Sequence, residues 1–292
     1  MRKRISRQLV APGRLDEIAE LGEAVADEHC PVGVVEPQAI AAAKGITLSF
    51  GQYGDAFDGM LEHKAGTFHI FCNLQRLRRP DAPRARFTLA HELGHYYIDE
   101  HRNALAASRA PAHQSQCDYE SPILAEQEAD HFAANLLMPL ARFLAKAGPA
   151  RPGLEGILSL AKRFNTSVTS MAIRYAAADV SPCAVVKWTW KGYAWKHLSS
   201  STLRASLRRT FESPADLAED SPTRRALAGE APPQAGYFRA GTTASAWFPR
   251  IARGDRRDAI FIEEAIPLRR YGVLTFLYPE AGTYAPAPGP GA

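Results

Sequence analysis

The stretch FTLAHELGHYYIDEH, residues 87–101, constrains this chain more than any other part of its sequence. It places His91, Glu92 and His95 in the pattern His-Glu-x-x-His, within a run that is otherwise apolar. The periodicity predicts a helix over residues 84–99, where histidines four positions apart share one face. Two imidazoles placed in this way can bind one small cation, which explains why ionisable groups stand in an apolar helix.

A second segment offers the further ligand that such a site needs. Zinc takes four ligands, and a catalytic zinc keeps one position for water, so a third protein ligand must come from elsewhere. Residues 125–139, AEQEADHFAANLLMP, predict a helix in which Glu126 and Asp130 share a face. We expect Glu126 to bind the metal and Asp130 to accept the free ring N–H of a ligand histidine. Glu128 points off that face and is the weaker choice.

Glu92 is the candidate catalytic base. It follows the first histidine and borders the open metal position, where it can take a proton from bound water and hand it to a leaving amine. The metal lowers the pKa of that water to roughly 7, so a carboxylate suffices as the base. The alternative is a helix with two histidines satisfied by local hydrogen bonds. The apolar setting, Gly94 for close helix approach and the second motif favour the metal site.

The bulk composition is that of a globular protein. The 292 residues are enough for two domains or one large one, and the net charge of +4 does not by itself argue for nucleic acid. No stretch has the 18 apolar residues of a membrane span, and the basic start has no apolar stretch behind it. Four cysteines without a Cys-x-x-Cys pair are typical of reduced thiols: Cys30, Cys72, Cys117 and Cys183. We expect a cytoplasmic protein.

Hydrophobic periodicity predicts an α+β chain that changes character near residue 178. Residues 102–122 are polar and predicted to be irregular. Residues 183–199 and 257–279 alternate and are expected to form hairpins of a smaller domain. Helices are predicted at 14–29, 37–45, 84–99, 125–139, 140–148, 154–164 and 166–178, and strands at 46–53 and 59–73.

The segments RARFTLAHELGHYYI and EQEADHFAANLLMP together resemble the ImmA/IrrE family of bacterial zinc metallopeptidases. The resemblance covers about residues 15–178 and implies a zincin-like, gluzincin core of an active-site helix, a partner helix and a small sheet. It implies zinc ligation by His91, His95 and Glu126, with Glu92 as the general base. Two imidazoles and a carboxylate also accept manganese.

The second motif departs from the family pattern at Asp130, where many relatives have asparagine. Either side chain can hold a histidine N–H, so the expected role of Asp130 is kept. The resemblance also implies a substrate: a helix-turn-helix transcriptional repressor, whose cleavage would derepress a stress, DNA-damage or mobile-element regulon.

The chain is expected to divide into a metallopeptidase domain at 1–150, helix-turn-helix-like helices at 151–178, a sensory α+β domain at 179–285 and a disordered tail at 286–292.

Other residues near the motifs are candidates for roles outside metal binding. Residues 63–73 read either as an edge strand that pairs with an extended substrate or as a core strand. His113 and Tyr119 are candidates for steadying an oxyanion. We expect His63 and His69 to be structural, and His101 and His131 to have no role in the site.

Two rival functions stay open: a non-proteolytic regulator that docks a repressor or toxin partner, and a nucleic-acid-binding regulator. In the helix pair at 154–178, Arg174 is the only basic residue that the second helix offers. A packing or repressor-docking role for this pair is therefore an alternative to DNA binding. Residues 187–209 carry six Lys or Arg, three tryptophans and no acid, which suits single-stranded nucleic acid. Trp188 and Trp190 should share one face of a strand, which also suits a buried face or a ligand pocket.

Overall fold

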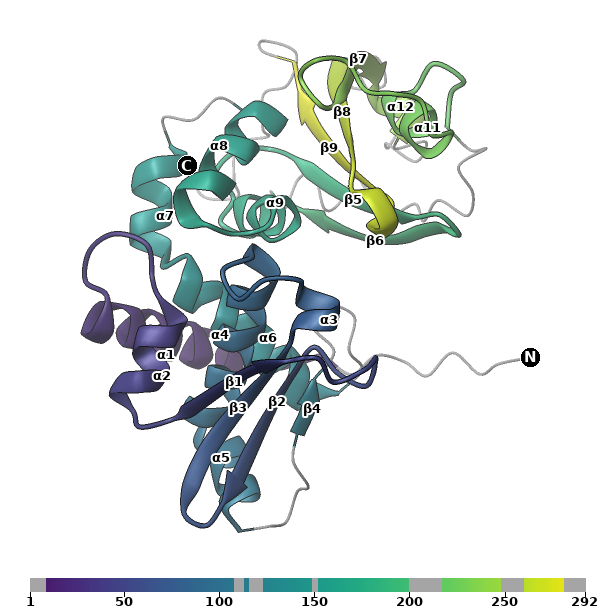
Figure 1. The fold of residues 1–292 in the computed structure, drawn as a ribbon. Helices are drawn as coiled ribbons and strands as arrows, with labels where there is room; N and C mark the ends of the chain where they lie inside the picture. Colours follow the sequence, from purple (N-terminus) through teal and green to yellow (C-terminus); the bar gives the residue numbers. More distant parts are fainter. Residues whose placement is uncertain are drawn as a thin grey trace, which may run out of the picture. The chain divides into compact units, whose positions relative to one another are not determined.

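The computed structural model describes residues 9–107, 113–115, 123–148, 152–199, 217–247 and 260–280. The chain is a mixed α+β protein with two sheets, as predicted (Figure 1). It forms two compact units, Met1–Phe143 with Lys162–Ser167, and Leu144–Ala161 with Val168–Ala292. The domain bounds predicted at 150 and 178 stay a prediction, and the predicted tail lies outside the described residues.

The first unit combines a four-stranded sheet with helices. Its sheet has the order β1-β3-β2-β4, in which β1 runs parallel to β3 and the other pairs are antiparallel. The strands are β1 (Thr47–Gly51), β2 (Gly59–Lys64), β3 (Thr67–Asn73) and β4 (His113–Ser115). The helices are α1 (Pro12–His29), α2 (Pro37–Ala43), α3 (Leu74–Leu77), α4 (Pro83–Tyr97), α5 (Asp99–Ala106), α6 (Leu124–Leu137) and the start of α7 (Leu140–Ala147).

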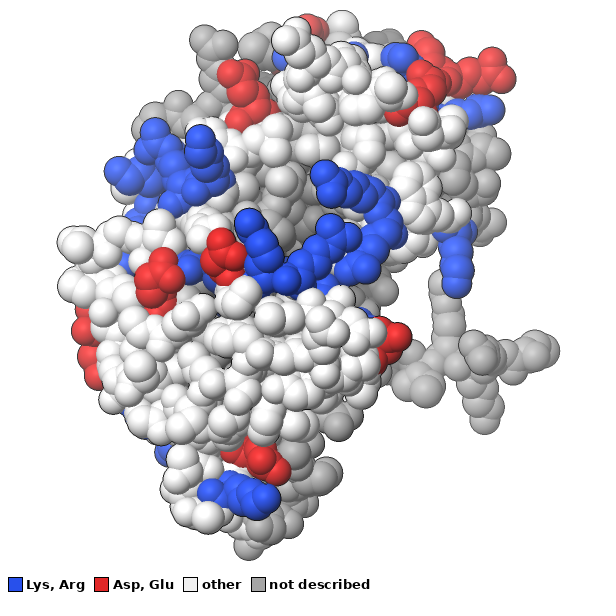
Figure 2. Space-filling view, viewed as in Figure 1, with Lys and Arg blue, Asp and Glu red and all other residues white. Residues whose placement is uncertain are grey.

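One face of this sheet forms the core against α4. Leu61 on β2 pairs in register with Ile70 on β3, and both side chains are fully buried. The opposite face carries His69, which bonds Thr47 and, at 3.0 Å, the hydroxyl of Ser49 across to β1. Over this sheet, the face of the molecule in Figure 2 is mainly uncharged. The sheet surface in that view therefore offers no continuous basic stripe for a nucleic acid.

Of the two alternatives for residues 63–73, an edge strand or a core strand, the structure shows the interior strand. Strand β3 is paired on both sides, by β1 and by β2, so its backbone groups are already used. Among the described strands, β4 is the outermost next to β2, and it pairs only with Gly59–Leu61. Sequence periodicity does not predict strand β4, because a strand of three residues is too short to show an alternating pattern.

The segment predicted to be irregular, 102–122, is partly regular. Helix α4 ends at Tyr97, Ile98 adopts an extended backbone, and a new helix, α5, begins at Asp99. The predicted helix at 84–99 is therefore confirmed but ends two residues early. Strand β4 also lies within residues 102–122. Residues 108–112 and 116–122 fall outside the described part of the chain.

Two glycines set the distance between the helices of the first unit. A Cβ built on Gly94 of α4 would lie 3.1 Å from the Cα atom of Ala129 on α6. A Cβ on Gly22 of α1 would lie 3.0 Å from the backbone oxygen of Phe132, also on α6. Because real Cβ atoms rarely approach backbone so closely, both glycines let α6 pack tightly against its neighbours. The expected close approach at Gly94 is confirmed.

The second unit is built on a five-stranded antiparallel sheet of order β6-β5-β9-β8-β7. Its strands are β5 (Ala184–Thr189), β6 (Gly192–Leu198), β7 (Phe238–Thr243), β8 (Ile260–Pro267) and β9 (Val273–Pro279). Its helical elements are α8 (Leu154–Phe164, whose last turn belongs to the first unit), α9 (Val168–Ala177), α11 (Pro222–Leu227), α12 (Ala244–Trp247) and the 3-10 turn η2 (Arg269–Tyr271).

Two adjacent buried glutamates hold this sheet to its helices, one on each face of β8. Glu263 accepts hydrogen bonds from the hydroxyl of Ser221 at 2.6 Å and from the indole N–H of Trp247 at 3.0 Å. Glu264 accepts from the backbone N–H of Leu154 at 2.5 Å and from the hydroxyl of Tyr278 at 3.0 Å. Burial raises the pKa of Glu264 above its ordinary value. Neighbouring strand residues point to opposite faces, so this pair anchors α11 and α12 on one side and α8 on the other.

The tryptophan pattern is only partly as predicted. Trp188 is fully buried in the core of the second unit, whereas Trp190 is 52% exposed. Strand β5 ends at Thr189, so Trp190 lies in the turn before β6 and shares no strand face with Trp188.

Helix α9 packs on the sheet, with the ring of Tyr175 lying 5.9 Å from that of Phe276. Residues 200–209 of the basic segment lie outside the described residues.

No helix in the described part of the chain has the length and apolarity needed to cross a membrane. The described cysteines Cys30, Cys72 and Cys183 are free thiols, and burial raises the pKa of Cys183 to about 12. Cys117 lies outside the described residues.

Candidate metal centre

Helix α4 carries the His-Glu-x-x-His motif, and it is buried along most of its length. Pro83 stands at its first turn, where the missing N–H costs no hydrogen bond. His91, Glu92 and His95 are 0%, 0% and 2% exposed. Because α4 packs between the sheet and α6, its imidazoles are held away from bulk water, and their polar atoms need partners within the fold.

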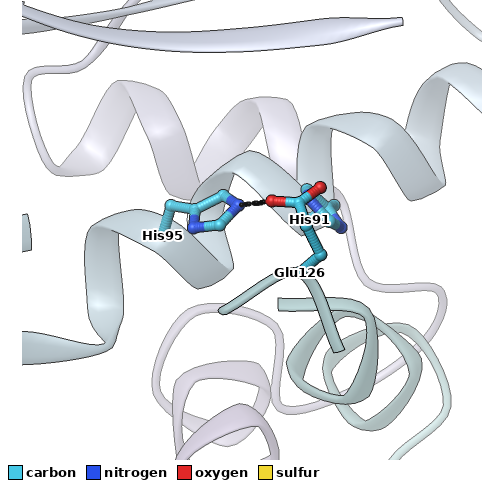
Figure 3. Close-up of side chains that lie close together, drawn as sticks. All are labelled: His91, His95 and Glu126. Carbon is cyan, nitrogen blue, oxygen red and sulfur yellow. Dashed lines mark hydrogen bonds and ion pairs between the residues drawn. The ribbon is translucent and has the colours of Figure 1, made fainter. Parts of the chain in front are cut away.

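Three donor atoms from two helices converge, as Figure 3 shows. The Nε2 atoms of His91 and His95 lie 3.1 Å apart. Glu126, on the first turn of α6, places one carboxylate oxygen 3.5 Å from His91 Nε2 and the other 3.2 Å from His95 Nε2. Glu126 is 6% exposed, so this donor set is buried as a whole.

The spacing of the two imidazoles fits a tetrahedral metal ion. Zinc–nitrogen and zinc–oxygen bonds of about 2.0–2.1 Å at tetrahedral angles put neighbouring donor atoms about 3.3 Å apart. The two Nε2 atoms, 3.1 Å apart, lie close to that value, and each faces a different oxygen of the Glu126 carboxylate, at 3.5 Å from His91 and 3.2 Å from His95. The donor chemistry, two imidazoles and one carboxylate, is that of catalytic zinc sites. The structure thus brings together the three ligands that the sequence indicated.

Asp130 lies where the sequence analysis placed it. Its carboxylate oxygen is 2.8 Å from Nδ1 of His91, the ring nitrogen that points away from the donor set. A carboxylate accepts hydrogen bonds only, so His91 carries its proton on Nδ1 and keeps the lone pair on Nε2 for a cation. This contact fixes both the tautomer and the direction of the ring.

His101, which was expected to have no role in the site, lies beside one of the histidines that face Glu126. Its Nδ1 atom lies 3.2 Å from Nδ1 of His95, and its Nε2 atom lies 3.0 Å from a carboxylate oxygen of Glu128. Glu128 in turn contacts Arg14 of α1, Nε to Oε1, at 3.3 Å. Glu128 does point off the ligand face, as expected. The sequence signal for His101 was its position six residues after His95, which a helix-only reading of the motif overlooks.

Glu92 is fully buried next to the first ligand, under strand β2. A Cβ on Gly59 would lie 2.5 Å from Oε1 of Glu92 and 2.5 Å from the methyl group of Thr88. Gly59 pairs in register with Ser115 of β4, so the outermost strand passes over the same region. The absent side chain at Gly59 leaves the space that the Glu92 carboxylate fills.

The remaining histidines contribute no donor to the cluster found among the described residues. The ring of His63 contacts that of Phe68 in a tilted arrangement with centroids 4.6 Å apart, and His69 bonds strand β1, which agrees with the structural roles expected. His131 directly follows Asp130 on α6. For His113 the structure describes only the backbone, in β4, and Tyr119 lies outside the described residues, so their expected oxyanion role stays a prediction.

Comparison with known proteins agrees with this site. Residues 78–175 match the peptidase family described as the IrrE N-terminal-like domain. Comparison with curated proteins gives no significant match. Among solved structures, a Mycobacterium tuberculosis transcriptional regulator is similar, with a TM-score of 0.56 and 14% identity over 93% of this chain and 92% of that chain. At this identity the structural similarity concerns the fold.

The family match spans both helices that supply the donor atoms, α4 and α6. It therefore covers His91, His95 and Glu126 together, and it supports a metallopeptidase rather than a fortuitous pair of histidines. The resemblance predicted from the two motif segments is confirmed: residues 78–175 of this chain match the IrrE N-terminal-like peptidase domain.

Proposed function

We propose that this protein is a zinc-dependent endopeptidase that cleaves a helix-turn-helix transcriptional repressor in the cytoplasm. The observation that carries the proposal is the buried donor set of His91, His95 and Glu126, whose ligand atoms lie within 4.8 Å of one another, next to the buried carboxylate of Glu92. The family match to a peptidase domain supports the reaction class. Manganese is the alternative ion, since the same donors accept it.

In this proposal the chain positions and exchanges protons around the cation. His91, His95 and Glu126 would hold the ion, which would lower the pKa of a water and polarise a peptide carbonyl. Glu92 would take up a proton at its carboxylate and return it to the amine of the departing segment. Its burial keeps competing solvent away from the carboxylate.

The substrate is proposed to lie extended along β4. This strand is the outermost one beside β2 among the described strands, and β2 passes over Glu92 at Gly59. Main-chain pairing with an exposed edge would give affinity without sequence preference, and side-chain pockets would give specificity. An extended backbone is rare in a folded repressor outside its linkers. A linker between the repressor's DNA-binding and oligomerisation parts is therefore the proposed place of cutting.

The competing function is a regulator that docks a repressor or toxin without cutting it. The similar solved structure is that of a transcriptional regulator, which favours this alternative. A pure scaffold gains nothing from a carboxylate buried beside three metal-binding groups, because burying a charge without a function costs free energy. Direct nucleic-acid binding is less favoured, because α9, the proposed recognition helix, buries Met171, Ala172 and Tyr175.

The decisive experiment pairs Glu92→Gln with the matched control Glu20→Gln on the exposed side of α1. Both proteins are mixed with zinc and a helix-turn-helix repressor encoded beside the gene, and fragments are followed by mass spectrometry. We expect Glu92→Gln to lower cleavage by at least about 100-fold, as for loss of a general base, and to keep repressor binding. Glu20→Gln should cleave normally. Equal cleavage by wild type and Glu92→Gln would refute the assigned base. Binding without any cleavage by the wild type would support the docking regulator instead.

A further inference from the structure

A chain of side chains runs outward from His95, on the side away from the donor set. His95 Nδ1 lies 3.2 Å from His101 Nδ1, and the two rings are tilted by 41° with centroids 5.1 Å apart. His101 Nε2 lies 3.0 Å from Glu128 Oε2. The side chains of His101 and Glu128 are 11% and 14% exposed, so water competes little for these contacts.

We propose that His101 and Glu128 are positioning residues that orient the ligand His95. The inference rests on the proposed metal site, and it concerns how that site is held. Metal ligands of the imidazole type donate their outer N–H to a carboxylate or carbonyl, which fixes the tautomer and raises ligand basicity. His91 does this directly with Asp130, whereas His95 does it through a second imidazole.

The direction of each hydrogen bond follows from the ends of the chain of contacts. A cation at Nε2 of His95 leaves the proton on Nδ1, so His95 donates to Nδ1 of His101. His101 must then carry its own proton on Nε2, which faces the acceptor-only carboxylate of Glu128. One arrangement of protons therefore satisfies both of these hydrogen bonds of His101. In the same arrangement the lone pair of His95 Nε2 can bind a cation held between His95, Glu126 and His91.

The position of Glu128 is fixed by an arginine from another helix. Arg14 of α1 contacts Glu128 at 3.3 Å and Glu100 of α5 at 2.8 Å. It thereby links α6, which carries Glu126 and Glu128, to α5, which carries His101. A guanidinium holds two carboxylates in fixed directions better than a single-point cation does. The support for His95 thus reaches from the metal site to the N-terminal helix.

The backbone at Ile98 explains why His101 supports a ligand and is not one itself. His91, His95 and His101 have the spacing His-Glu-x-x-His-x-x-Gly-x-x-His, in which the last histidine is the third ligand of another zincin class. Here Ile98 replaces the glycine; it is 2% exposed and extended, and α5 begins directly after it. His101 therefore faces the outer nitrogen of His95, and Glu126 occupies the third donor position.

The test distinguishes the hydrogen bond accepted by the His101 ring nitrogen from the packing of the His101 ring. His101→Phe keeps a ring against His95 but offers no acceptor, whereas His101→Asn keeps an acceptor near the place of Nδ1 without the ring. Zinc affinity is measured by competition with a chromophoric chelator, on full-length proteins whose folding is checked by circular dichroism. We expect His101→Phe to bind zinc about 10- to 100-fold more weakly, the range for losing such outer partners, and His101→Asn to bind within a few-fold of wild type.

Two further measurements keep the inference open to refutation. Glu128→Gln retains an acceptor but loses the charge, so its zinc affinity should fall between those of wild type and His101→Phe, while His131→Phe on α6 should bind as wild type. In the zinc-loaded protein, long-range ¹⁵N NMR should find His101 neutral, with its proton on Nε2. Wild-type zinc affinity in His101→Phe, or a proton on Nδ1 of His101, would overturn the inference.

These outcomes are distinct from failure of the proposed function. A wild type that binds zinc but cleaves no repressor would refute the proteolytic role and leave the positioning role standing, because the readout is metal affinity. A wild type that binds no zinc would overturn both.

Discussion

Gly59 lies against the carboxylate of Glu92 so closely that a Cβ at this position would stand 2.5 Å from Oε1. The backbone of Gly59 does not require glycine, since no positive φ occurs there. The glycine is instead required by its neighbour: strand β2 and helix α4 meet with just enough room for the proposed base. The sheet is therefore part of the site, although it supplies no metal ligand.

Gly59→Ala should damage catalysis while sparing the metal. The added methyl group displaces the Glu92 carboxylate by roughly 1 Å, and a misplacement of that size costs about 100-fold in rate. Zinc affinity should stay within a few-fold of wild type, because none of the three donors touches Gly59. The measurements are repressor cleavage and chelator competition. Gly241→Ala in β7, where a Cβ meets nothing within 4 Å, is the matched control. Normal cleavage by Gly59→Ala would contradict the crowding argument.

Gly94→Ala should loosen the packing of the two metal-binding helices. Alanine gains about 1 kcal/mol of helix propensity, but overpacking against the backbone of Ala129 costs about 1–3 kcal/mol. We expect a net loss of about 1 kcal/mol in the free energy of unfolding, measured with urea, together with weaker zinc binding because Glu126 moves with α6. Gly13→Ala, with open space around its Cβ, should show neither effect.

Asp130 can be tested by two substitutions that differ in one property. Asp130→Asn keeps an oxygen that accepts the Nδ1–H of His91, so zinc affinity should fall only a few-fold. Asp130→Ala removes the acceptor and should weaken zinc binding by about 10- to 100-fold. Isothermal titration with zinc checks both. Equal affinity in the two variants would show that the contact at 2.8 Å does not orient His91.

The ion pairs of Asp58 predict how stability depends on pH. Burial opposes ionisation of this carboxyl, yet Arg76 at 2.6 Å and Arg84 at 2.7 Å hold its pKa below the ordinary value. A lowered folded-state pKa adds stability that is complete above about pH 4, the unfolded value, and is lost as the pH falls through the lower folded value. Asp58→Asn should cost about 3 kcal/mol at pH 7, as for breaking a buried pair.

The acid limb of urea unfolding checks this assignment. Wild-type stability should fall below about pH 4 more steeply than that of Asp58→Asn, which lacks the titrating group. Asp81→Asn is the control, because Asp81 is 73% exposed and its pair with Arg79 contributes little. Parallel pH profiles for wild type and Asp58→Asn would rule out a role for the Asp58 charge in stability.

Metal removal should lower stability in proportion to affinity. An ion that binds only the folded chain adds RT ln(1 + [L]/Kd), about 2.7 kcal/mol at 100 times Kd. A chelator should therefore lower the melting temperature, and added zinc should restore it. His91→Ala should show no response to either, since it lacks a donor. A wild-type melting temperature unaffected by both would contradict a metal site.

The local part of the site could be predicted from sequence because helix geometry is fixed by the backbone. His91 and His95 are one turn apart on any α-helix, and Glu126 and Asp130 follow the same rule on α6. Once two apolar helices each carry such a pair, burial requires that the polar groups meet or bind something. Their identification therefore needed no knowledge of how the helices cross.

Only the tertiary structure decided which groups contact these histidines and which strands lie inside the sheet. His101 reaches His95 because the chain turns at Ile98, and Glu128 reaches His101 because α6 packs close to α4 at Gly94. Strand β3 is interior because β1 pairs with its second edge, and Trp190 is exposed because β5 ends one residue earlier. Such contacts depend on the relative placement of elements distant in sequence, which side-chain periodicity within one element does not encode.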